Sequence, residues 1–326
     1  MPKPVPPATV DYVFPPNHDY RYFADGDRHA FRHRARRFEL VNAWWLAEAS
    51  LLSYAEGDFA ARVFKAAGFQ VDPAQPMSGP STQCYVVHNK QMVIVAFRGT
   101  QVYKPGLNRP LDAVLRDEVS DIFLDANFQF VRWPRGGHVH KGFQQGLDEI
   151  WQDKLQPYLE RLSREKPERS VWFTGHSLGG ALATLAADRF EHVDGLYTFG
   201  SPRVGDAVFT SGFHAKPQTY RFVNNNDIVA RVPWIGPYER LSQGVGIYKH
   251  VGRLMYIDSE GRLVENPSDW NRFIDDFRGS FGHLAAASGR MTAGGLAELP
   301  VDHLNDHAPI YYAVHIWNQY ERGLAP

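Results

Sequence analysis

The chain has 326 residues, of which 44% are hydrophobic and 13% aromatic, enough to bury a sizeable core and to exclude intrinsic disorder over most of its length. Lys and Arg total 35 against 36 Asp and Glu, a formal net charge of -1, so charge gives no reason to expect nucleic acid as a partner. The single cysteine, Cys84, excludes an intramolecular disulfide and argues against a cysteine zinc site.

Neither a secretory signal nor a membrane span is visible in the sequence. The first residues, Met-Pro-Lys-Pro-Val-Pro-Pro, lack an apolar run, and no apolar stretch is long enough to cross a bilayer as a helix. We therefore expect a soluble, cytoplasmic protein, while secretion by a route without an N-terminal signal stays open. The sequence does not indicate an oligomeric state.

Residues 1–37 are rich in Pro, His and Arg, and we interpret them as an N-terminal extension ahead of a single domain at 38–326. Within the extension, residues 28–37 are strongly basic. Such a run is typical of a solvated surface, so we expect a basic helical face in solvent there rather than a nucleic-acid site.

The first half of the domain contains clear periodic patterns. Apolar residues at helical spacing predict an amphipathic helix over 38–55. Two strands are predicted at 84–88 and 91–97, with a tight turn between them. A long helix is predicted from 143 to 162, and Pro157 inside it should kink or split it.

Strands and helices alternate in the second half. A short buried strand at 171–174 precedes a small-residue helix at 178–190, and further strands are predicted at 195–199 and 219–223. This alternation predicts one α/β domain, with a mainly parallel sheet covered by helices on both faces.

Residues 174–180 read Thr-Gly-His-Ser-Leu-Gly-Gly and have the G-x-S-x-G form between a predicted strand and a predicted helix. A serine on a sharp strand-to-helix turn needs glycine two residues to either side, because side chains there would collide. The helix that follows directs backbone N–H groups at any oxyanion formed beside the serine. This context predicts that Ser177 is a nucleophile.

A serine nucleophile requires a base and an acid that orients the base, and in doubly wound hydrolases they follow the serine in the order acid, then histidine. Asp206 and Asp227 are the acid candidates. Asp227 is favoured because its strand runs into a polar turn at the carboxyl edge of the sheet. Asp206 lies in a Gly/Pro-rich loop and resembles a turn residue.

Among the later histidines, His303 and His307 lie close together, four residues apart. A metal pair on a helix would need a third ligand, which is not evident, and Pro309 favours a loop. Spacing alone does not choose between these two histidines. The other candidates are His214, His250, His283 and His315.

Four segments resemble the class 3 lipases, a family that includes the fungal triacylglycerol lipases and many bacterial esterases. They are 95–100 (Val-Ala-Phe-Arg-Gly-Thr), 139–143 (Val-His-Lys-Gly-Phe), 175–180 (Gly-His-Ser-Leu-Gly-Gly) and 199–205 (Phe-Gly-Ser-Pro-Arg-Val-Gly). They appear in the family's order. The resemblance extends over roughly 40–320 and implies an α/β-hydrolase fold and serine-dependent ester hydrolysis without a metal or organic cofactor.

By position, the resemblance implies Ser177 as nucleophile, Asp227 as acid and His307 as base, with Thr100 and Leu178 as the oxyanion hole. His307 is preferred over His303 because Asp306-His307, followed by Tyr311 or Tyr312, is similar to the family's terminal Asp-His segment. The family often has proline where Ala230 stands.

The family also covers its site with a movable helix, which would fall at 101–123 here; an ordinary surface helix is the alternative. Apolar residues at 270–300 suit either an acyl-chain wall or a covering helix. The expected substrate is an acylglycerol or similar fatty acyl ester, met at a lipid–water interface. The alternatives are a carboxylesterase, a phospholipase, an aryl or polymer esterase, or a non-catalytic lipase-like binding module.

Overall fold

The computed structural model describes the chain except for residues 73–74, 101–128, 214–217, 233–247, 266–304 and 325–326. The expectations for a lid at 101–123 and for the apolar region 270–300 therefore lie outside the described residues. The same holds for His303 and for two of the other histidine candidates, His214 and His283.

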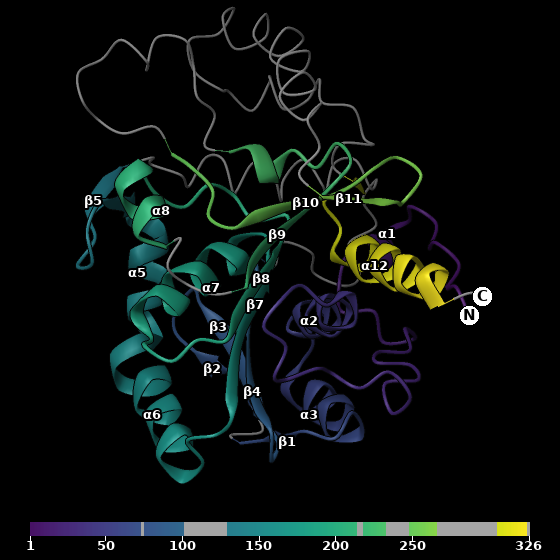
Figure 1. The fold of residues 1–326 in the computed structure, drawn as a ribbon, viewed down its shortest axis with the longest axis horizontal. Coiled ribbons are helices and arrows are strands. Elements are labelled where there is room, and N and C mark those ends of the chain that lie inside the picture. The colour runs from purple at the N-terminus through teal and green to yellow at the C-terminus, as the bar shows by residue number, and fades with distance from the viewer. Residues whose placement is uncertain (73–74, 101–128, 214–217, 233–247, 266–304, 325–326) are drawn as a thin grey trace, which may run out of the picture.

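A sheet of nine strands runs through the middle of the described part of the chain (Figure 1). Its strands are β1 (Gln70–Val71), β2 (Met77–Ser78), β3 (Gln83–His88), β4 (Met92–Phe97), β7 (Ser170–His176), β8 (Gly195–Phe199), β9 (Thr219–Asn224), β10 (Arg253–Ile257) and β11 (Leu263–Glu265). Strands β4, β7, β8, β9 and β10 lie side by side and parallel, while β3 and β11 pair antiparallel at either end. A separate hairpin joins β5 (Phe130–Arg132) to β6 (His138–His140).

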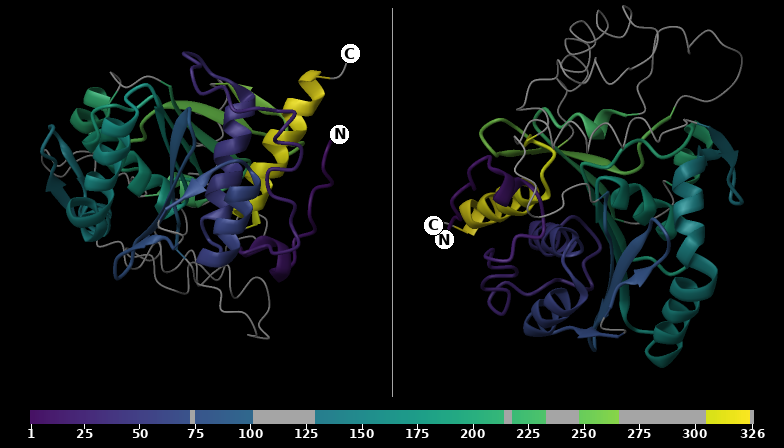
Figure 2. Two further views of the ribbon diagram at one scale, coloured as in Figure 1. Left: turned by 90° about the horizontal axis from the view of Figure 1, so that it is seen from below. Right: turned by 180° about the vertical axis from the view of Figure 1, so that it is seen from behind.

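Helices cover both faces of this sheet, as the views in Figures 1 and 2 show. One face carries α1 (Val10–Val13), α2 (Leu40–Leu52), α3 (Gly57–Ala66) and α12 (Pro309–Leu324); the other carries α5 (Lys141–Ile150), α6 (Gln156–Glu165), α7 (Leu178–Arg189) and α8 (Ala207–Phe213). The predicted mainly parallel sheet between two helical layers is confirmed.

Side chains of a central strand alternate between two cores, as the two-residue period of a strand requires. On β4, Ile94 and Ala96 pack beneath α2 and α12, whereas Val93 and Val95 pack beneath α5 and α7. Because both faces are buried, the strand reads as a continuous apolar run.

The predicted helix over 143–162 is divided, but the break precedes the proline. A five-residue π-helix, Trp151–Leu155, separates α5 from α6. Pro157 lies in the first turn of α6, directly after the π turn, and has no N–H to continue the hydrogen-bond ladder of the preceding turn. The predicted interruption of the helix thus falls beside the proline.

The arginines at 28–37 are exposed to solvent, as expected, but the expectation that they lie on a helix is wrong. These residues form turns rather than a helix. Phe31 is buried and packs edge-on against Trp172, with ring centroids 5.0 Å apart, and Arg32 Nη1 pairs with Glu39 Oε2 at 2.7 Å. None of the helices in the described part of the chain is long and apolar enough to cross a membrane.

Candidate active site

Ser177 occupies the sharp turn between β7 and α7. The strand ends at His176 and the helix begins at Leu178. Ser177 itself has φ 57 and ψ -131, a conformation that non-glycine residues rarely adopt, and its side chain is fully buried. Its Oγ has no hydrogen-bond partner among the described residues. The strand–turn–helix context expected for G-x-S-x-G is therefore present.

The flanking glycines are required by close backbone approach. A Cβ on Gly175 would stand 2.3 Å from Gly179 O, and a Cβ on Gly179 would stand 2.3 Å from Phe97 O. Both neighbours are backbone atoms, which cannot turn away as a flexible side chain would. The turn is thus packed directly against the end of β4.

We expect Gly175→Ala to lower the free energy of unfolding by about 1–3 kcal/mol, because the added methyl group overpacks the turn. Urea denaturation followed by circular dichroism measures this loss. Gly212→Ala in α8 is the matched control, since none of the described residues lies within 4 Å of the added carbon. Equal stability of the two variants would show that the turn is not tightly packed.

Thr100 and Leu178 lie on either side of the turn. Leu178 is the first residue of α7, and the first N–H groups of a helix have no acceptor within it. Thr100 follows Gly99, whose added Cβ would stand 3.1 Å from Ser177 Cβ, so this segment passes beside the serine. Both residues are placed where backbone N–H groups can face an oxygen bound next to Ser177.

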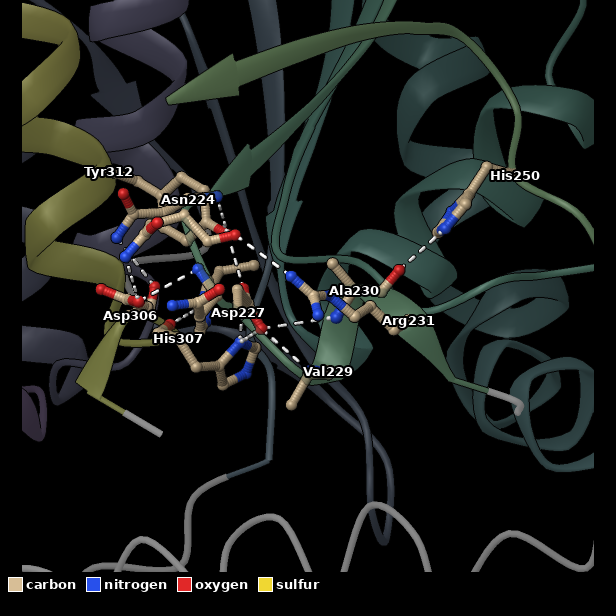
Figure 3. A network of polar contacts seen from close by, with 12 residues as sticks. Asn224, Asp227, Val229, Ala230, Arg231, His250, Asp306, His307 and Tyr312 are labelled. Carbon is tan, nitrogen blue, oxygen red and sulfur yellow. Dashed lines mark hydrogen bonds and ion pairs between the residues drawn. The ribbon is translucent and has the colours of Figure 1, made fainter. Parts of the chain in front are cut away.

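Asp227 and His307 are paired by hydrogen bonding, as Figure 3 shows. His307 Nδ1 lies 3.0 Å from Asp227 Oδ1 and 2.9 Å from Oδ2. Asp227 comes from the turn after β9, and His307 from the turn just before α12. Both side chains are buried. The structure thus brings together the acid and the histidine that the sequence favoured.

Further groups hold the Asp227 carboxylate in place. Tyr312 donates its hydroxyl to Oδ2 at 2.5 Å, and Val229 donates its backbone N–H to Oδ1 at 2.9 Å. The Tyr312 oxygen in turn accepts from Asn224 N at 3.0 Å. Burial, and then the charge of Asp227, raise the pKa of the Tyr312 hydroxyl well above its usual value, so it remains a donor. The sequence suggested Tyr311 or Tyr312 only as part of a motif.

Asp306 fastens the histidine turn to the turn after β9. Its Oδ2 accepts from Asn225 Nδ2 at 2.9 Å and from Asn226 N at 3.0 Å, while its backbone oxygen accepts from Asn224 Nδ2 at 3.0 Å. These bonds keep the segment that holds His307 against the segment that holds Asp227 (Figure 3). The run of three asparagines before Asp227 was the only sequence signal for this contact.

The rival acid, Asp206, lies in a different environment. Its Oδ1 accepts from Phe209 N at 2.9 Å, and its Oδ2 lies 2.9 Å from His138 Nδ1. It thus caps the start of α8, which agrees with its interpretation as a turn residue. Of the alternative histidines, His250 Nε2 donates to Ala230 O at 2.8 Å, away from the Asp227 carboxylate (Figure 3).

Within the described residues no group of three His, Cys, Asp or Glu side chains is arranged to hold a metal ion. Cys84 is buried, and burial raises the pKa of its thiol, so it is a core residue rather than a second nucleophile.

Residues 94–236 match the family model described as Lipase (class 3). Over this segment, which is less than half of its length, the chain is similar to the class 3 lipases. The match includes Thr100, Ser177 and Asp227 and ends before His307, whose place in the site therefore depends on the contacts described above.

The chain also matches segments of lipases from a fungus and a plant. The chain is 38% identical to a lipase of Rhizomucor miehei over 120 residues, which are 33% of this chain and 33% of that protein. It is 27% identical to triacylglycerol lipase OBL1 of Arabidopsis thaliana over 231 residues, 55% of this chain and 40% of that one. The matched segments thus span less than half the length of these relatives.

Solved lipase structures share the fold. One is a triacylglycerol lipase described as having a serine protease triad as its catalytic centre; it matches with a TM-score of 0.54 and 24% identity, over 72% of this chain and 89% of that one. A deletion mutant of the Rhizomucor miehei lipase propeptide complex matches with a TM-score of 0.52 and 23% identity, over 68% and 67%. Both likenesses establish the α/β-hydrolase fold expected from the sequence.

Proposed function

We propose that this protein hydrolyses carboxylic esters through an acyl-enzyme on Ser177, with His307 as base and Asp227 as the acid that orients it. The main support is the buried Asp227–His307 pair at the sheet edge where the serine turn lies. Ser177 N donates to Phe199 O at 3.0 Å, and the next residue, Gly200, lies against both members of that pair.

The proposed mechanism follows from which nitrogen of the His307 ring is hydrogen-bonded to Asp227. Because His307 Nδ1 faces the Asp227 carboxylate, that nitrogen holds the proton and Nε2 keeps its lone pair. Nε2 takes the Ser177 hydroxyl proton as Oγ attacks the ester carbonyl, and then donates it to the leaving alcohol. Water releases the acid from the acyl-enzyme by the same route. Asp227 stabilises the imidazolium that forms in each half of the reaction.

The tetrahedral intermediate places a negative charge on the former carbonyl oxygen. Leu178 N, at the start of α7, and Thr100, beside the serine, are proposed to donate to this oxygen. Each such donor contributes about 3–4 kcal/mol to transition-state stabilisation. The dipole of α7 adds to the same effect.

The proposed substrates are acylglycerols or similar fatty acyl esters. The named relatives include a lipase and a triacylglycerol lipase, which favours long apolar acyl groups. The same triad also serves carboxylesterases and phospholipases, because pocket shape rather than the triad determines the ester that is cleaved.

Initial rates on p-nitrophenyl esters from acetyl to palmitoyl, together with emulsified triglyceride, test the substrate class. A maximum at long chains and a rise in rate once an interface forms are expected of a lipase. A maximum at short chains without that rise would indicate a carboxylesterase. Absence of hydrolysis, with no labelling of Ser177 by a phosphonate probe, would favour a non-catalytic binding module.

A further inference from the structure

His176, the residue between Gly175 and Ser177, is buried between Tyr54 and the proposed base. Its Nε2 lies 2.6 Å from the backbone oxygen of His307, and its Nδ1 lies 2.8 Å from the hydroxyl of Tyr54. The two imidazole rings lie 4.4 Å apart with an interplanar angle of 36°. His176 therefore contacts the turn that carries His307 both through a hydrogen bond and through its ring face.

The partners determine the tautomer of His176. A carbonyl oxygen only accepts, so Nε2 must carry the proton and donate it to His307 O. Nδ1 is then the acceptor in neutral imidazole, and the Tyr54 hydroxyl donates to it. Without that donor the ring would be free to place its proton on Nδ1, and two lone pairs would then face each other at the His307 carbonyl.

The surroundings also keep His176 neutral. Burial, and then the neighbouring His307, lower the pKa of His176 well below its usual value. A second imidazolium beside His307 would oppose the positive charge that His307 gains during proton transfer. A neutral His176 is thus compatible with a neighbour that repeatedly gains and loses a proton.

We propose that Tyr54 and His176 are positioning residues that fix the backbone of His307, a proposal that rests on the function proposed above. Asp227 holds the ring at Nδ1, and His176 holds the same residue at its carbonyl oxygen. Fixing both ends determines where Nε2 points. A displacement of about 1 Å at a reacting group can reduce the rate by about 10²-fold.

Gly99 shows how closely these groups are packed against the rest of the site. A Cβ at this position would stand 2.1 Å from the Tyr54 hydroxyl and 2.7 Å from His176 O. The segment that leads to Thr100 therefore lies directly on the Tyr54–His176 pair. Tyr54 therefore lies against both His176 and the segment that leads to Thr100.

The test is Tyr54→Phe, with Tyr85→Phe as the matched control. Tyr85 is also buried and donates its hydroxyl to the backbone oxygen of Ala55, next to Tyr54, at 3.0 Å, so its loss costs a similar hydrogen bond without touching His176. For Tyr54→Phe we expect kcat to fall by about 10–100-fold with KM nearly unchanged, because orientation rather than binding is lost. For Tyr85→Phe, kcat should stay within about twofold of the unaltered chain.

A second readout does not depend on ester hydrolysis. Nitrogen-15 NMR of histidine-labelled protein should show His176 as the neutral Nε2–H tautomer, and this population should decrease in Tyr54→Phe but not in Tyr85→Phe. His176→Gln, which keeps an amide donor, should retain more activity than His176→Leu. An Nδ1–H tautomer in the unaltered chain, or equal kcat for the two tyrosine variants, would overturn the proposal. An inactive chain with the expected tautomer would refute only the proposed function.

Discussion

Ser177→Ala is expected to reduce kcat for ester hydrolysis by about 10⁶-fold, because removing the nucleophile removes the covalent route altogether. The remaining rate, about 10³–10⁴-fold above that in water, would come from binding and the oxyanion donors alone. Purified variant assayed on p-nitrophenyl butyrate, with a phosphonate probe to quantify any contaminating enzyme, measures the loss.

The control for this variant is Ser211→Ala in α8, where the hydroxyl is exposed and donates to Val208 O. It should keep full activity and an unchanged melting temperature. If Ser177→Ala retained more than a few per cent of the rate in contaminant-free protein, the nucleophile would have to be another residue.

Asp227→Asn is expected to lower kcat by about 10⁴-fold while leaving the fold intact. The fixed backbone N–H of Val229 excludes the amide NH₂ from the Oδ1 position, whereas the Tyr312 hydroxyl proton that points at Oδ2 can rotate away. It must therefore face His307 Nδ1, which then accepts, so that the proton moves to Nε2. In that tautomer His307 cannot take the serine proton.

Asp206→Asn tests whether the acid of the proposed triad is Asp206 rather than Asp227. Asp206 also contacts a histidine and a backbone N–H, so the substitution removes the same kinds of contact outside the proposed triad. We expect kcat within about twofold of the unaltered chain and at most a modest loss of stability. If Asp206→Asn lost most of its kcat while Asp227→Asn stayed active, the acid of the triad would be Asp206 and not Asp227.

Local pattern predicted much of the fold. Continuous apolar runs identified β4 and β7, and glycines around a serine between a strand and a helix identified the turn at Ser177. The strand that runs into asparagines placed Asp227 at the sheet edge. Each of these features depends on neighbouring residues, so the sequence contained the information.

Contacts between distant segments were not predictable in the same way. The bonds of Tyr54 to His176, and of Asp306 to Asn225, join residues separated by 122 and 81 positions. His307 could be preferred over His303 only through a family resemblance, because spacing alone does not show which histidine meets the carboxylate.

The backbone conformation that presents the Ser177 side chain for catalysis also lowers the stability of the folded chain. A side chain held at φ 57 and ψ -131 costs about 1–3 kcal/mol, which glycine would avoid at the same position. Glycine loses part of this advantage through the greater freedom it gives the unfolded chain. A laboratory selection for thermal stability alone would therefore favour Ser177→Gly. Selection of thermostable variants of this chain would have to include an assay of activity.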